Sequence, residues 1–90
     1  MSERTVRVAS RTGLHARPAK IFVQAAARLG VPVRVRSGAK SAPANSMLAV
    51  LALGAVQGAE VTLEADGPGA EAALDELAAL LATDLDADDA

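Results

Sequence analysis

The stretch GLHARPA, residues 13–19, lies between a segment of alternating hydrophobicity and a segment of helical period, and it decides how the fold begins. Gly13 permits a sharp turn, and Pro18 suits the first turn of a helix, where backbone N–H groups lack intrahelical partners. The stretch therefore predicts a strand-to-helix junction. Unpartnered N–H groups and the positive end of the helix dipole favour an anion there. His15, the only histidine, and Arg17 lie at this predicted anion site.

The segments on either side of this junction have different periods. Residues 5–8 alternate polar and apolar side chains, which predicts a strand with Val6 and Val8 facing the core. Residues 10–13 are predicted as the turn, and the spacing after it predicts a helix over Ala16–Leu29. The predicted buried face of this helix holds Ala19, Phe22, Ala26 and Leu29, and Gly30 ends it.

Three further segments have the properties of strands. Residues 33–36 and residues 60–64 alternate polar and apolar side chains. Ser37-Gly38 is predicted as a hairpin turn from the first of these into a strand over residues 40–42. Pro43 cannot donate to a strand ladder, so this hairpin partner is predicted at a sheet edge.

Two further helices are predicted. Ser46 is expected to N-cap a short apolar helix over residues 47–53, which Gly54 ends. The last helix is predicted over residues 70–81, after the break at residues 66–69. Its buried stripe holds Leu74, Leu77 and Leu81.

The resulting order, β-α-β-β-α-β-α, belongs to the α+β class. Strands with one solvated face each indicate one antiparallel sheet of four strands. Right-handed crossovers then place all three helices on the same face of that sheet. We therefore expect residues 1–90 to form a single domain, an open-faced two-layer sandwich.

Composition excludes several classes of protein. The chain has no cysteine, which excludes disulfides and thiol chemistry and fits a reducing cytosol. No apolar run reaches membrane-spanning length, and residues 1–4 lack the apolar segment of a signal peptide. We expect a cytoplasmic protein that does not insert into membranes.

The net charge of −2 conceals a division along the chain. Residues 1–59 hold all nine Lys and Arg and one carboxylate side chain, Glu3, whereas residues 60–90 hold the other ten. One interpretation is an interaction surface. The other is that the basic residues cover several solvated faces, and that the acidic residues 84–90 fray because the helix dipole disfavours acid there. A nucleic-acid-binding domain is disfavoured, because Phe22 is the only aromatic side chain available for stacking.

Few chemical roles are open to His15. No second histidine or cysteine completes a ligand set, so a metal site is not predicted. A Ser-His-Asp arrangement needs an orienting acid, and the first 59 residues offer only Glu3. Two interpretations remain: an ordinary capping or surface histidine, and a histidine that is itself the nucleophile. In the second, the backbone amides of Ala16 and Arg17 and the guanidinium of Arg17 stabilise a transferred phosphoryl group.

The stretch at residues 13–19, together with Ser46-Met47-Leu48, resembles the HPr family, the histidine-containing phosphocarrier proteins of the sugar phosphotransferase system. The resemblance covers nearly the whole chain and implies the strand order 1-4-2-3. It implies that His15 accepts a phosphoryl group at Nδ1 from phosphorylated enzyme I, which phosphoenolpyruvate charges, and passes it to a IIA domain of a sugar permease. It also implies a monomer without a cofactor, a carrier rather than a turnover enzyme.

The short helix beside the site is a candidate docking surface for these partners. Met47, Leu48 and Leu51 are the candidate contact residues, because so short a helix cannot bury every apolar side. The alternative is that most of them belong to the core. The resemblance places the matching helix at the docking surface, and nearby Lys and Arg would steer an acidic partner.

Ser46 also has two interpretations. In many family members from Gram-positive bacteria the matching serine is phosphorylated by HPr kinase/phosphorylase, which regulates the carrier. Asn45 and Ala49 stand where kinase-regulated members usually have lysine and glycine, so the alternative is an N-cap alone. The sequence does not separate a sugar carrier from a regulatory or nitrogen-system relative, nor does it identify the sugars served.

Overall fold

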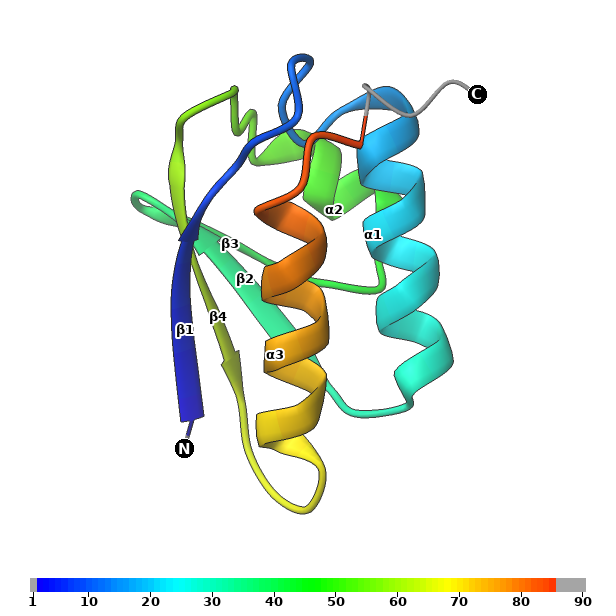
Figure 1. Cartoon of the computed structure of the whole chain (residues 1–90). Coiled ribbons are helices and arrows are strands. Elements are labelled where there is room, and N and C mark those ends of the chain that lie inside the picture. Colours follow the sequence, from blue (N-terminus) through cyan, green and yellow to red (C-terminus); the bar gives the residue numbers. More distant parts are fainter. Residues whose placement is uncertain (1, 86–90) are drawn as a thin grey trace.

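The computed structural model describes residues 2–85, and its elements follow the predicted order (Figure 1). The strands are β1 (Ser2–Arg7), β2 (Val33–Ser37), β3 (Lys40–Pro43) and β4 (Glu60–Ala65). The helices are α1 (Ala16–Leu29), α2 (Met47–Ala52) and α3 (Ala70–Leu81). The four strands form one sheet in the order β1-β4-β2-β3, and every neighbouring pair is antiparallel. Both the α+β class and the strand order implied by the family resemblance are confirmed.

The helices lie together on one face of the sheet, and the other face is open (Figure 1). The strand alternation explains this arrangement, because Val33, Val35, Val61 and Leu63 are buried while the residues between them are more exposed. The helices cover these positions with their own apolar stripes. Phe22 of α1 and Leu74 and Leu77 of α3 are fully buried, as the helical spacing predicts.

Some boundaries differ from the predicted ones. β1 begins at Ser2 rather than at Thr5, because Ser2 pairs with Ala65 at the end of β4. Ser37 pairs with Lys40, so the hairpin turn consists of Gly38 and Ala39 rather than Ser37 and Gly38. A turn that begins one residue later suits Gly38, whose φ of +62° is readily adopted by glycine.

The second helix ends one residue earlier than predicted, and the edge strand lies where expected. α2 runs to Ala52, and Leu53 is its C-cap before Gly54 turns the chain. β3 lies at the edge of the sheet, which accommodates the missing N–H of Pro43. None of the helices within residues 2–85 combines the length and the apolar character that crossing a bilayer needs.

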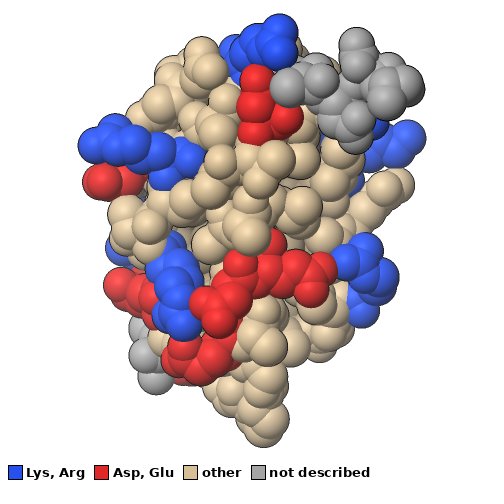
Figure 2. All heavy atoms as spheres, in the orientation of Figure 1, with Lys and Arg blue, Asp and Glu red and all other residues tan. Residues whose placement is uncertain are grey.

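The two oppositely charged parts of the sequence pair with each other in the folded chain. Acidic side chains gather over α3, with basic side chains beside them (Figure 2). Each of the ion pairs found among residues 2–85 joins an arginine from the first part to a carboxylate from the last. They are Arg4–Glu71, Arg4–Asp75, Arg7–Glu60, Arg11–Asp84, Arg28–Glu76 and Arg36–Glu64. The charge division therefore serves pairing within the chain.

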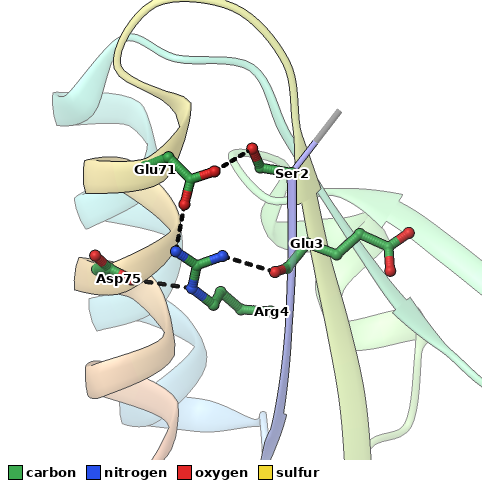
Figure 3. A network of polar contacts seen from close by, with 5 residues as sticks. All are labelled: Ser2, Glu3, Arg4, Glu71 and Asp75. Atoms are coloured by element: carbon green, nitrogen blue, oxygen red, sulfur yellow. Dashed lines mark hydrogen bonds and ion pairs between the residues drawn. The ribbon is translucent and has the colours of Figure 1, made fainter.

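Arg4 connects the edge strand β1 to α3 (Figure 3). Its Nε donates to Oδ1 of Asp75 at 3.0 Å, and another guanidinium nitrogen donates to Glu71. Ser2 Oγ also donates to Glu71. The hydrogen bond from Ser2, and then that from Arg4, hold the pKa of Glu71 below its usual range, while the bond to Glu71 raises the pKa of Arg4.

Candidate functional site

His15 ends the loop between β1 and α1 and occupies the N-cap position of α1. Its backbone is extended, with φ −147° and ψ 162°, and its side chain is exposed. His15 is thus the N-cap by position, but its side chain makes no cap hydrogen bond. The imidazole is therefore presented to solvent at the start of a helix.

Gly13 fixes the place of this loop. Its φ is +73°, and a β-carbon added to it would lie 2.3 Å from the carbonyl oxygen of Ala55 and 2.8 Å from Cα of Val56. The next residue, Leu14, is 2% exposed and donates its backbone N–H to the same Ala55 oxygen at 2.9 Å. A side chain at position 13 would therefore displace the loop from the segment between α2 and β4, and His15 with it.

Ala16 begins α1 in a left-handed conformation, with φ of +49°. This conformation costs an L-residue other than glycine about 1–2 kcal/mol. Backbone strain of this kind is concentrated at sites of ligand binding and catalysis. The strain lies directly after His15, where it sets the direction in which the first helical amides point.

The first turn of α1 offers donors to an anion. Pro18 has no N–H, and the N–H of Ala19 makes a long bond of 3.4 Å to the carbonyl oxygen of His15. None of the residues of this turn is acidic, so the turn itself adds no negative charge at the positive end of the helix dipole. Arg17 lies in the same turn, two residues after His15, and is exposed.

Ser46 is the N-cap of α2, as predicted. Its Oγ accepts a hydrogen bond from the N–H of Ala49 at 3.3 Å, and its backbone is extended, with φ −109°. The residue is half-buried. Because one hydroxyl lone pair is used by the cap, a modification of Oγ would act directly on the start of α2.

The predicted docking residues differ in exposure. Leu48 is 83% exposed, whereas Met47 and Leu51 are half-buried and pack against the core. The sequence did not indicate Val56, which is 65% exposed and whose backbone touches Gly13. Val56 lies in an irregular segment without a hydrophobic period, so the sequence pattern gives no sign that it belongs to the site. Only its closeness to the His15 loop in the fold indicates this.

The hollows described in the structure do not involve His15. A hollow at the far end of α1 is lined by Gly30, Arg34 and Asn45 among others, but by no residue of the His15 loop. Among residues 2–85, no group of three or more His, Asp or Glu side chains is arranged to hold a metal ion.

Comparisons with known proteins found a family model, relatives and solved structures that match most of the chain. The family model described as the PTS HPr component phosphorylation site matches residues 2–83. The chain is 54% identical to the phosphocarrier protein HPr of Streptomyces coelicolor, over 96% of this chain and 94% of that one. It is 40% identical to the HPr-like protein Crh of Bacillus subtilis, over 88% and 93%. The crystal structure of HPr from Bacillus anthracis superposes with a TM-score of 0.85 at 34% identity, covering 89% and 95%.

Proposed function

The chain belongs to the HPr family, the phosphocarriers of the phosphotransferase system, and on this premise we propose that His15 carries the phosphoryl group from enzyme I to a IIA domain. One observation supports this assignment most strongly. His15 is exposed at the N-terminus of α1 and its side chain makes no cap hydrogen bond. The same place therefore offers a nucleophile and an anion site.

Transfer begins with a neutral imidazole whose proton is on Nε2, which leaves a lone pair on Nδ1. Nδ1 attacks the phosphorus of phosphorylated enzyme I, a P–N bond to His15 forms, and the bond from phosphorus to enzyme I breaks. The electron pair of the broken bond stays with enzyme I. The second transfer repeats these steps with His15 as the leaving group and a IIA residue as the nucleophile. The chain is thus a carrier that is covalently modified and regenerated.

The phosphoryl group needs charge stabilisation more than covalent chemistry. We assign this role to the backbone amides of Ala16 and Arg17 and to the guanidinium of Arg17. A guanidinium has two parallel N–H groups that fit two phosphate oxygens. The first turn of α1 itself holds no carboxylate that would repel the phosphoryl group.

Docking is assigned to the apolar surface beside His15. Leu48 supplies the most exposed apolar side chain, Met47 and Leu51 support it, and Val56 extends it to the His15 loop. An exposed apolar patch next to the reactive group suits a carrier that exchanges partners. Enzyme I and a IIA domain would occupy this patch in turn, which fits a monomer that acts in the cytoplasm.

Labelling with phosphoenolpyruvate and enzyme I tests the assignment. The wild-type chain should take up one phosphoryl group that is labile to acid and stable to base, and His15→Ala should take up none. Arg17→Gln should still be labelled, but more slowly. Equal labelling of His15→Ala would overturn the proposal, and circular dichroism should show that this variant keeps the fold.

A regulatory role is a second candidate, favoured by the similarity to Crh of Bacillus subtilis, which is described as a catabolite repression HPr. Phosphorylation of Ser46 by HPr kinase/phosphorylase would place a dianion at the N-terminus of α2, next to the exposed Leu48. Incubation with that kinase and ATP should label the wild type and not Ser46→Ala. Transfer from the phosphorylated chain to IIA domains of the sugar and nitrogen branches, compared side by side, identifies the branch served.

A further inference from the structure

The segment that follows α3 is hydrogen-bonded to the loop that leads to His15. Ser10 lies in the middle of that loop and is 2% exposed. Among residues 2–85 it is the one polar residue that is buried. Its Oγ donates to the carbonyl oxygen of Thr83 at 3.3 Å and accepts from the N–H of Leu85 at 2.9 Å. Both hydrogen bonds of this hydroxyl thus go to one short segment from the other end of the chain.

The residues on either side of Ser10 make bonds to the same segment. The N–H of Ala9 donates to the carbonyl oxygen of Leu81 at 2.9 Å. The N–H of Arg11 donates to Oδ1 of Asp84 at 3.3 Å, and its Nε donates to Oδ2 at 3.0 Å. Three consecutive loop residues are therefore bonded to residues 81–85, which we call the strap.

These contacts differ from the fraying predicted to start at Asp84. The strap begins with Leu81, the last residue of α3, and Figure 1 shows the chain leaving α3 in the direction of the N-terminal end of α1. Asp84 and Leu85 are both tied to the loop. Residues 86–90 lie outside the described part of the chain.

The strap is connected to His15 through a short path. The carbonyl oxygen of Ser10 accepts from the N–H of Gly13 at 2.9 Å, which closes the turn before the reactive residue. On its other side the loop is bonded to the segment before β4, because Leu14 donates to Ala55 and the Gln57 amide donates to the Ala9 oxygen at 3.2 Å. The loop is thus held between two segments, one on each side.

We propose that Ser10 is a positioning residue for phosphoryl transfer, through which the strap holds the His15 loop in the geometry that transfer requires. This inference rests on the proposed function of His15. Transfer between two bound proteins depends on the placement of the nucleophile, and a displacement of about 1 Å can cost about 10²-fold in rate. An apolar side chain could fill the space of Ser10, but it could not form hydrogen bonds to Thr83 and Leu85. The hydroxyl of Ser10 forms both, and so fixes where the strap attaches to the loop.

Ser10→Ala tests this role, with Val33→Ala as the control. Val33 is a buried residue at the opposite end of the sheet, so its truncation lowers stability without touching the loop. In Ser10→Ala, single-turnover transfer from phosphorylated enzyme I should slow about tenfold, while the dissociation constant for enzyme I changes less than about twofold. Hydrogen exchange of the Gly13 and Leu14 amides should accelerate. Val33→Ala should leave the transfer rate and both loop amides within about twofold of wild type.

The possible outcomes distinguish a failure of the role proposed for Ser10 from a failure of the role proposed for His15. If Ser10→Ala matches Val33→Ala in transfer rate and loop exchange, Ser10 has no positioning role. If wild type is not labelled at all, the proposed function fails, and the amide exchange still tests the strap. Asp84→Asn weakens the strap without altering the buried site, and should show a smaller loss in the same direction. A faster transfer in Asp84→Asn would overturn the proposal and identify Asp84 as an electrostatic brake instead.

Discussion

Gly13 and Ala55 approach so closely that a β-carbon on the glycine would lie 2.3 Å from the alanine carbonyl oxygen. The same oxygen accepts the N–H of Leu14, the residue before His15. The segment between α2 and β4 therefore sets the position of the loop that ends at His15, although it belongs to a distant part of the sequence.

Gly13→Ala should lower the free energy of unfolding by about 2–4 kcal/mol, from the left-handed backbone and from the collision with Ala55. Gly38→Ala is the matched control, because Gly38 also has a positive φ, of +62°, but nothing lies within 4 Å of an added β-carbon. That variant should lose only about 1 kcal/mol. Urea unfolding measures both, and equal losses would contradict the role of the close approach.

Ala16→Gly should raise the free energy of unfolding by about 1 kcal/mol, since glycine adopts the φ of +49° without strain. Ala27→Gly, on the exposed face of the same helix, should lower it by about 0.5–1 kcal/mol. Opposite signs in thermal or urea unfolding are the expected result. A loss in both variants would mean that Ala16 is not strained.

The contacts of Glu71 make stability depend on pH. Because the folded state lowers the pKa of Glu71 below its ordinary value of 4.5, its stabilisation is complete above that value and is lost as pH falls through the lower folded value. Unfolding measured from pH 6 down to pH 2 should show this loss in wild type. Glu71→Gln should reduce the slope, and Arg4→Gln should reduce it in part, since Ser2 still donates to Glu71. An unchanged slope in Glu71→Gln would contradict the network of Figure 3.

Leu48→Asp and Val56→Asp should each weaken enzyme I binding about tenfold or more, because each places a charge in the proposed apolar docking surface. Both side chains are exposed, so the free energy of unfolding should change by less than about 0.5 kcal/mol. Ala27→Asp, an exposed change far along α1, should bind normally. Titration calorimetry gives the three affinities, and normal binding by Leu48→Asp would remove it from the docking surface.

Periodicity predicted most of the fold, because each strand and helix buries one face. The alternation of residues 33–36 and 60–64 and the leucine stripe of α3 all reach the core as expected. The N-cap of Ser46 was predictable for a similar reason, since capping is a local interaction. The strand order came from the family resemblance, because local periods do not specify which strands pair.

Long-range contacts were not predictable from the sequence. The charge division suggested an interaction surface or solvated faces, and only the fold shows that arginines such as Arg28 pair with carboxylates such as Glu76. Val56 has no periodic neighbours, and Ser10 resembles an ordinary turn serine until Leu85 is seen to bond it. These features depend on which distant segments the fold brings together.

Identification of the atom that accepts the phosphoryl group is the decisive test of the role proposed for His15. The chain should be labelled with ¹⁵N, phosphorylated with phosphoenolpyruvate and enzyme I, and studied by ¹⁵N and ³¹P NMR. We expect a phosphorus bonded to Nδ1 of His15 and no phosphate on Ser46. A phosphorus bonded to another residue, or to Nε2 of His15, would contradict it.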